Sequence, residues 1–252
     1  DVAASITEDV AVLMLTEVDY RSGRMHDMKS LTELAHANGV VTVWDLAHSA
    51  GAIPVDLSGC NADFAVGCTY KYLNGGPGAI AGIFVADRHL SPERLDQLHG
   101  WWGNHTRSRF QMAREFDPAP GADVFQMSNP PILSLAPVVG ALDLFVEAQL
   151  PRLRQKSVEL TGYLEFLLKK RFADRIRIIT PADARGAQLS LVVTADDIEP
   201  RAVFDGLVAR NVTGDWREPD VIRVAPAPLY NNFTDAFEFA ERLEDVFREP
   251  GA

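Results

Sequence analysis

Cysteine is scarce in this sequence, with only Cys60 and Cys68 among its 252 residues. Their spacing is typical of neither a zinc site nor a disulfide framework. No metal-ligand spacing connects five of the histidines either, namely His26, His36, His89, His99 and His105. We therefore expect no metal site, and the low cysteine content favours a reducing, cytoplasmic location.

The sequence also lacks any block of basic residues. Lys and Arg total 24, whereas Asp and Glu total 35, which gives a net charge of −11. A surface that binds the phosphate backbone of a nucleic acid needs concentrated positive charge. We therefore expect no nucleic-acid partner.

Long apolar runs are missing as well. The run VAVLML at 10–15 is far shorter than the roughly 18 residues that indicate a membrane span, and no signal-peptide pattern is visible. We expect no membrane association. The chain begins on Asp1 rather than Met and continues at once into a strand-like stretch, so we expect it to be part of a longer protein.

The residues that are present have an ordinary globular composition, 47% hydrophobic and 23% charged. The first part alternates apolar, β-branched runs with one helical pattern. It predicts strands at 10–15, 40–44, 62–70 and 79–86 and a helix at 28–38. This order favours an α/β fold with parallel neighbouring strands, whose ligands collect at the carboxyl ends of the strands.

The later part has a different pattern. Residues 91–130 read as long loops around short elements, which are more often functional than accidental. Helical patterns cover 131–150 and 152–172. The remainder predicts a small α+β layer, with strands at 176–180, 188–195 and 221–226 and helices at 198–210 and 234–248. We expect residues 1–135 to form part of a large domain and residues 136–252 to contain connecting helices and a small C-terminal domain.

Polar residues follow three of the predicted strands. Thr16 follows the first, Asp45 and His48 follow the second, and Tyr70 and Lys71 follow the third. Any one of them alone would be read as a solvated loop residue. Because the carboxyl ends of parallel strands meet at one edge, their joint placement predicts a shared site.

The residue types in this group have a specific chemistry. A partly desolvated lysine near another cationic group can form a Schiff base with a carbonyl, although its unperturbed pKa is about 10.4. A carboxylate such as Asp45 suits a pyridinium nitrogen. Together these groups meet the needs of pyridoxal phosphate (PLP). The glycines at 75, 76 and 78 would let the backbone turn sharply beside such a cofactor.

Several motifs in this order resemble those of kynureninase, a fold-type-I PLP-dependent enzyme of the class V aminotransferase-like group. They are DLAHSAG at 45–51, TYKYLNGGPG at 69–78, GWWG at 100–103, FQMSNPP at 125–131 and IRVAPAPLYN at 222–231. The similarity runs over nearly the whole chain and is with the later part of the enzyme. It implies a mainly parallel sheet in a large PLP-binding domain, followed by a small C-terminal α+β domain.

The resemblance also implies roles for the five strand-end residues. Lys71 would bind PLP and then act as the base at the substrate Cα. Asp45 would keep the pyridine nitrogen protonated, and His48 would lie against the cofactor near its ring oxygen. Tyr70 would bind the phosphate and serve as a proton donor, and Thr16 would add a hydroxyl to the pocket. A structural role for His48 remains an alternative.

Three further residues match family positions. Trp101, through its indole N–H, and Asn129 would complete the site from the partner subunit of a homodimer, and Asn129 would also contact substrate. Arg223 would pair with the substrate α-carboxylate. Core packing for Trp101, a turn at Asn129 and a protein carboxylate as the partner of Arg223 remain alternatives.

The activity implied is hydrolytic Cβ–Cγ cleavage of L-kynurenine to anthranilate and L-alanine in tryptophan catabolism, with 3-hydroxykynurenine as an open second substrate. The alternatives are another fold-type-I enzyme, either a cysteine desulfurase or a class V aminotransferase, and a non-catalytic fragment. A desulfurase needs a nucleophilic cysteine in a late loop, whereas both cysteines here precede Lys71.

Overall fold

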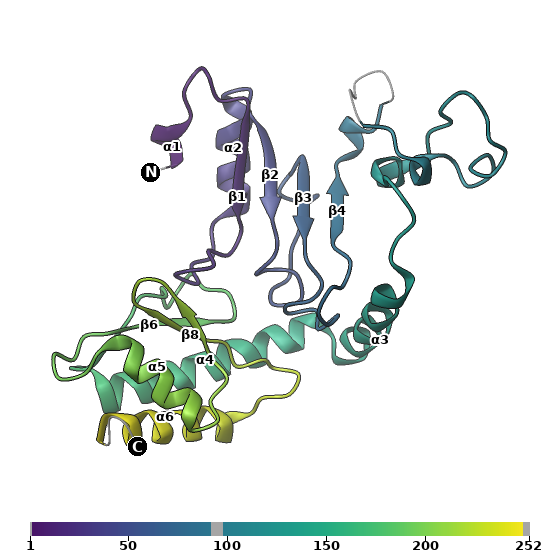
Figure 1. Cartoon of the computed structure of the whole chain (residues 1–252). Helices are drawn as coiled ribbons and strands as arrows, with labels where there is room; N and C mark the ends of the chain where they lie inside the picture. Colours follow the sequence, from purple (N-terminus) through teal and green to yellow (C-terminus); the bar gives the residue numbers. More distant parts are fainter. Residues whose placement is uncertain (1, 92–97, 249–252) are drawn as a thin grey trace. The chain divides into compact units, whose positions relative to one another are not determined.

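The structure is a computed structural model that describes residues 2–91 and 98–248. Its residues form two compact units (Figure 1). The first unit comprises residues 1–17, 27–50 and 55–143, and the second comprises 18–26, 51–54 and 144–252.

A four-stranded sheet in the order β1-β2-β3-β4 forms the centre of the first unit (Figure 1). Strands β1 (Val12–Thr16), β2 (Val41–Asp45) and β3 (Phe64–Gly67) are parallel, whereas β4 (Gly82–Val85) is antiparallel to β3. The carboxyl ends of the three parallel strands therefore meet at one edge of this sheet.

Helix α2 (Met28–Ala37) connects β1 to β2 and packs on the sheet. It begins where the side chain of Asp27 accepts a hydrogen bond from the Ser30 N–H over 3.0 Å, which satisfies a donor of the first turn. Trp44 of β2 is fully buried, and its indole N–H donates to the hydroxyl of Thr32 in α2 over 3.0 Å. This bond lets a polar aromatic side chain lie in the core. The short helix α1 (Val2–Ser5) precedes β1.

A buried carboxylate stands just before β3. Asp63 is 3% exposed and accepts hydrogen bonds from α2, from β2 and from the 3-10 helix η1 (Asp87–His89). Burial by itself would raise the pKa of Asp63, but these hydrogen bonds outweigh it and hold the pKa well below its usual range. The donors are the backbone and hydroxyl of Thr42 and the side chains of His36, Arg88 and His89.

The predicted loop region is folded on itself around two further 3-10 helices, η2 (Trp101–Gly103) and η3 (Gly121–Phe125). The N–H of Ala119 donates to the carbonyl of Gly103 over 2.8 Å, which closes the intervening segment. Helix α3 (Ile132–Ala148) follows η3 and is apolar on most of its surface. Among the described residues no single helix is long and apolar enough to cross a membrane; the bent pair formed by α3 and the next helix, α4, passes that test by length and composition only.

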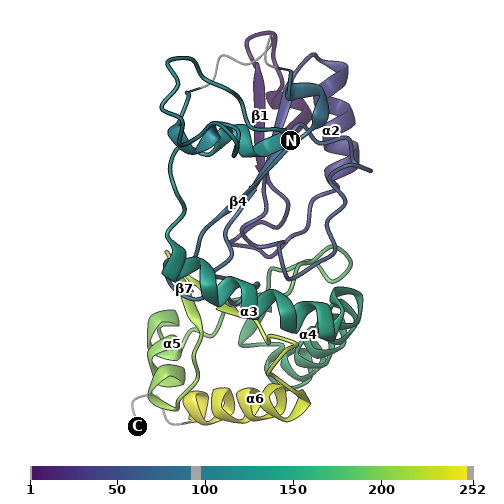
Figure 2. The same ribbon diagram turned by 90° about the vertical axis from the view of Figure 1, so that its right-hand side faces the viewer.

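The second unit contains a four-stranded antiparallel sheet in the order β5-β6-β8-β7. Three helices share one apolar core with it, and α6 lies beside α4 and α5 (Figure 2). The strands are β5 (Ile176–Ile178), β6 (Leu189–Val193), β7 (Asp215–Arg217) and β8 (Val221–Val224); the helices are α4 (Leu150–Phe172), α5 (Pro200–Ala209) and α6 (Phe233–Arg248).

Three features differ from the sequence prediction. The strand expected at 62–70 ends at Gly67, so Tyr70 and Lys71 lie in a loop. The strand expected at 79–86 begins at Gly82 and is antiparallel to its neighbour. Strand β7 was not predicted, because a run of three residues has too little alternation to be recognised and depends on its pairing with β8.

Candidate active site

Two predicted site residues lie directly opposite each other at the carboxyl edge of the first sheet. Thr16 and Asp45 are the last residues of β1 and β2 and are register partners. The N–H of Glu17 donates to the carbonyl of Asp45 over 3.1 Å, so the strands remain paired up to this edge. Because β3 ends at Gly67, the loop that carries Lys71 leaves the same edge.

The amine of Lys71 contacts the imidazole of His48. Nζ of Lys71 lies 3.0 Å from Nε2 of the buried His48, within hydrogen-bonding distance. An ammonium group can only donate, so Nε2 accepts when Lys71 is charged. The His48 ring also meets the ring of Tyr72 edge-on, with 6.1 Å between centroids.

A hydrogen-bonded turn after β2 sets the positions of Asp45 and His48. The N–H groups of Ser49 and Ala50 both donate to the carbonyl of Leu46, over 3.0 Å and 2.9 Å. At the start of the turn the N–H of Ala47 donates to Oδ1 of Asp45 over 2.8 Å. That bond orients the carboxylate and does not use Oδ2. Oδ2 can therefore accept a hydrogen bond from a protonated nitrogen of a ligand.

Tyr70 is 50% exposed, and its ring centroid lies 5.7 Å from Nζ of Lys71. The nearby thiol of Cys68 is the largest cause of a raised pKa for the Tyr70 hydroxyl, and the charge of Asp45 adds to it. The hydroxyl is therefore protonated at neutral pH and can donate a hydrogen bond or a proton.

The loop that carries Lys71 is closed by bonds at its base. The hydroxyl of Thr69 donates to the carbonyl of Ile80 over 2.6 Å, and the N–H of Gly75 donates to the carbonyl of Thr69 over 2.8 Å. Gly76 has a φ of +82°, a conformation that side chains with a Cβ rarely adopt. Glycine at position 76 thus permits the turn of the loop beside Lys71.

Sequence reasoning did not single out Glu17, which follows Thr16 at the same edge. Its side chain is 7% exposed, and its Oε2 makes no hydrogen bond to any described residue. Burial raises the pKa of Glu17, and the hydroxyl of Ser49 offsets part of that rise. The only available signal was its position one residue beyond a strand end.

Trp101 and Asn129 lie in the loop region of the first unit, on segments that run against each other. A Cβ at Gly100 would lie 2.2 Å from Cα of Met127, so only glycine permits this approach. Asn129 is exposed, and its Oδ1 accepts a hydrogen bond from the hydroxyl of Ser128 over 3.2 Å. The structure thus brings the Trp101 and Asn129 segments together.

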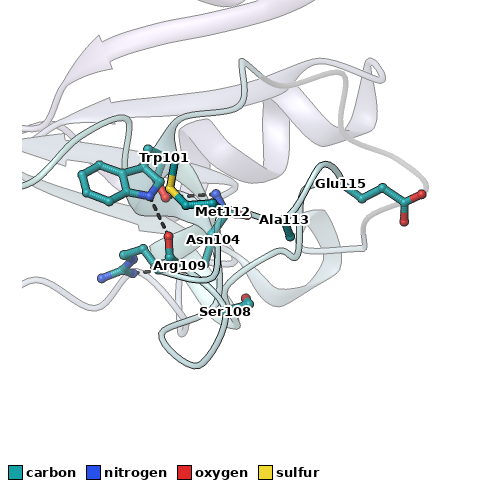
Figure 3. Close-up of a pocket in the computed structure, with 7 residues that line it drawn as sticks. All are labelled: Trp101, Asn104, Ser108, Arg109, Met112, Ala113 and Glu115. Atoms are coloured by element: carbon teal, nitrogen blue, oxygen red, sulfur yellow. Dashed lines mark hydrogen bonds between the residues drawn. The ribbon is translucent and has the colours of Figure 1, made fainter.

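The indole N–H of Trp101 donates to the carbonyl of Arg109 over 2.8 Å (Figure 3). The guanidinium of Arg109 lies 4.1 Å from the ring centroid of Trp102 and donates to the carbonyls of Trp102 and Asn104. Arg109 therefore stabilises the backbone of the segment from Trp102 to Asn104. Around it is a pocket of about 390 Å³ lined by Trp101, Asn104, Ser108, Arg109, Met112, Ala113 and Glu115.

Arg223 belongs to the second unit, in β8. Its guanidinium is paired with Asp215 of β7 and also donates to the carbonyl of Tyr20 over 2.6 Å. A protein carboxylate, that of Asp215, therefore pairs with Arg223 in this structure.

The donor set at the first sheet edge fits PLP. It offers an amine at Lys71, a carboxylate at Asp45, an imidazole at His48 and hydroxyls at Thr16 and Tyr70, beside a glycine loop. These are the groups that a carbonyl, a pyridine nitrogen, a ring oxygen and a phosphate need. Among the described residues no group of three or more His, Cys, Asp or Glu could hold a metal ion.

Comparison with solved structures identifies the fold. The cystine C–S lyase C-DES matches with a TM-score of 0.83 at 17% identity, covering 97% of this chain and 63% of its own. The cysteine desulfurase CsdA from Escherichia coli matches with a TM-score of 0.80 at 18% identity, covering 98% of this chain and 61% of its own. Alanine–glyoxylate aminotransferase from Nostoc sp. matches with a TM-score of 0.68 at 19% identity, covering 94% of this chain and 62% of its own. The predicted fold class, that of fold-type-I PLP-dependent enzymes, is confirmed.

Comparison of sequences is more specific. The chain is 48% identical over 237 residues to a kynureninase from Stenotrophomonas maltophilia, covering 93% of this chain and 56% of the relative. It is 46% identical over 248 residues to a kynureninase from Xanthomonas campestris pv. campestris, covering 96% of this chain and 58% of that relative. The chain thus spans little more than half the length of these relatives. Residues 153–243 match the family model of the kynureninase C-terminal domain. The resemblance inferred from the motifs is therefore confirmed, and the chain is a relative of the kynureninases over nearly all of its residues.

Proposed function

We propose that the protein containing this chain is a PLP-dependent hydrolase that cleaves the Cβ–Cγ bond of L-kynurenine to give anthranilate and L-alanine in tryptophan catabolism. The observation that carries the proposal is the contact of the Lys71 amine with His48 at the sheet edge where Asp45 ends β2. The choice of substrate rests on the similarity to kynureninases.

The bound cofactor would supply an electron sink for the electrons of the substrate Cα–H bond. Lys71 would hold the cofactor and carry the Cα proton. Asp45 would keep a proton on the pyridine nitrogen through Oδ2. Tyr70 would donate to the phosphate and return a proton, and Thr16 would contribute a hydroxyl. His48 would lie against the cofactor near its ring oxygen and orient the Lys71 amine.

The substrate would be held by its α-carboxylate, which the guanidinium of Arg223 suits. Hydrolysis adds the elements of water across the Cβ–Cγ bond, so that Cβ becomes the methyl group of alanine and Cγ the carboxyl carbon of anthranilate. A ring hydroxyl lies away from both reacting carbons, so 3-hydroxykynurenine is a second candidate substrate.

We further propose a cytoplasmic homodimer in which Trp101 and Asn129 complete the site of the partner subunit, with Asn129 also touching substrate. Three large apolar side chains of this loop region support an interface there: Trp101, Phe110 and Met112 are 48%, 70% and 84% exposed. In this arrangement residues 1–135 form part of the PLP-binding domain and residues 136–252 the connecting helices and small domain.

The nearest alternative is a cysteine desulfurase or a class V aminotransferase. The fold is compatible with both, but a desulfurase needs a mobile nucleophilic cysteine. Cys60 and Cys68 are both half-buried and precede Lys71. They therefore do not supply one in a later loop.

The test is anthranilate formation from L-kynurenine by the PLP-loaded protein and by its Lys71→Ala variant. We expect turnover in the unmodified protein, and loss of both turnover and the visible band of lysine-bound PLP in the variant. Lys29→Ala, an exposed lysine in α2, is the matched control. Kynurenine cleavage that persists without Lys71 would exclude the proposed role, and a protein that produces alanine from cysteine instead would favour a desulfurase.

A further inference from the structure

Three charged side chains share one face of the second unit's sheet. Asp215 of β7 and Arg223 of β8 are register partners on neighbouring antiparallel strands, so their side chains lie on the same face. Arg217 stands two residues after Asp215 and therefore points to that face as well.

Asp215 binds one edge of the Arg223 guanidinium, and the carbonyl of Tyr20 binds the remaining nitrogen. Nε donates to Oδ2 of Asp215 over 2.6 Å, and Nη2 donates to the same oxygen. Nη1 donates to the backbone carbonyl of Tyr20 over 2.6 Å. Only 11% of the Arg223 side chain is exposed, so these bonds fix its orientation.

A guanidinium carries five N–H donors, of which one belongs to Nε and two to each Nη. The three bonds above leave one hydrogen on Nη1 and one on Nη2. The outer edge between these nitrogens is the fork that binds a carboxylate through two parallel hydrogen bonds. Asp215 thus occupies the edge formed by Nε and Nη2, and one hydrogen each on Nη1 and Nη2 is left for a ligand.

The charge balance also favours an anion. If Asp215 faced Arg223 alone, the pair would be neutral and a carboxylate ligand would gain little from it. The same Oδ2 of Asp215, however, lies 3.2 Å from Nε of Arg217. Two arginines therefore share one carboxylate, and the group keeps a surplus of one positive charge.

We propose that Asp215 is a positioning residue that aims Arg223 at the α-carboxylate of an amino acid substrate, and that Arg217 supplies the surplus charge for binding it. This inference rests on the proposed function and adds two residues to it. It predicts carboxylate-dependent binding that requires Asp215, even though Asp215 is itself an anion.

The experiment compares L-alanine with ethylamine, which has the same amine and carbon chain but no carboxylate. Each is titrated into the PLP-loaded protein, and binding is followed by the absorption of bound PLP. We expect Asp215→Ala to weaken L-alanine binding about tenfold, as for loss of about one oriented charge-assisted hydrogen bond, and to leave ethylamine binding unchanged. Asp215→Glu, which keeps the carboxylate, should recover part of the loss.

If charge alone mattered, Asp215→Ala would bind L-alanine more tightly, since it removes a negative charge. Tighter or unchanged L-alanine binding would therefore overturn the positioning role. Arg217→Gln should weaken L-alanine binding about threefold at low salt and less at high salt. A loss that did not depend on salt would contradict the charge role.

Asp197→Asn is the matched control, because Asp197 pairs with Arg175 in the same unit through both carboxylate oxygens. It should leave both titrations unchanged. Asp215 is 44% exposed, so thermal unfolding should show that its variants remain folded. A protein that binds PLP at Lys71 without cleaving kynurenine would contradict the proposed substrate, while the ratio of L-alanine to ethylamine binding would still decide the roles of Asp215 and Arg217.

Discussion

Nζ of Lys71 and Nε2 of His48 lie 3.0 Å apart although the two residues are 23 positions apart in the sequence. The contact joins the turn after β2 to the loop after β3. Because both segments leave the same sheet edge, the sheet topology rather than local sequence creates it. The imidazole is therefore placed to orient the amine on which the proposed chemistry depends.

Replacing His48 by Ala removes the side chain that contacts the Lys71 amine. We expect turnover of L-kynurenine to fall about tenfold, as for loss of one hydrogen bond of about 1.4 kcal/mol, with a weaker band of lysine-bound PLP. Steady-state kinetics and absorption spectra measure both. His99→Ala is the control, since His99 is exposed and stacks on Phe116. Equal effects of the two substitutions would show that His48 has no special role.

Replacing Asp63 by Ala should be strongly destabilising. It removes a buried carboxylate that accepts from His36, Arg88 and His89 and leaves those donors without their acceptor. We expect the free energy of unfolding to fall by about 3 kcal/mol at pH 7, as for a broken buried ion pair. Denaturant unfolding measures the change, and Asp87→Ala, an exposed aspartate in η1, should change it by less than about 0.5 kcal/mol.

The contribution of Asp63 should also depend on pH. Its pKa in the folded protein lies below the value of about 3.9 for an unfolded chain, so its stabilisation is fully present above pH 4 and is lost as the pH falls below that value. The difference between the protein and Asp63→Ala should therefore shrink as the pH falls below 4. A difference that grew as the pH fell below 4 would contradict this account.

Glu17→Gln should stabilise the protein at neutral pH. Burial raises the pKa of Glu17, so the folded state disfavours its charged form, and the wild-type protein loses stability as the pH rises through that raised pKa. A neutral amide avoids this cost, and we expect a gain of about 1 kcal/mol at pH 8 that diminishes toward pH 4. Thermal unfolding across this range tests it. Glu33→Gln, on α2, should give no such pH-dependent gain.

Arg109→Ala should loosen the segment that carries Trp101. The guanidinium donates to two backbone carbonyls and stacks on Trp102. Its loss should lower the free energy of unfolding by about 1–2 kcal/mol and expose the indole rings to solvent. We expect tryptophan emission to shift to longer wavelength and acrylamide quenching to increase. Arg107→Ala removes an exposed side chain nearby and should change neither.

Much of the first unit could be predicted from the sequence. The apolar runs before Thr16 and Asp45 are strands with polar ends, and a β-α-β order fixes which ends meet, although Val12 and Met14 of β1 are exposed rather than buried. The long helices α3 and α4 were likewise visible from their patterns. The place of Lys71 was predictable to the sheet edge but not to its contact with His48, because loop conformation after a strand depends on packing.

The second unit shows what sequence alone could not supply. Arg223 was recognised from a motif, but its partner Asp215 lies on a three-residue strand that exists through pairing with β8. The direct opposition of these two residues is a property of register, which no local pattern near Asp215 encodes. Glu17 was missed for a related reason, since its burial arises from surrounding segments and not from its neighbours in sequence.

The most direct test of the account is to reduce the PLP-loaded protein with borohydride and map the modified peptide by mass spectrometry. The account predicts that the pyridoxyl group is attached to Lys71 and that Lys71→Ala carries none. Attachment at another lysine, or no attachment in a protein that cleaves kynurenine, would contradict it.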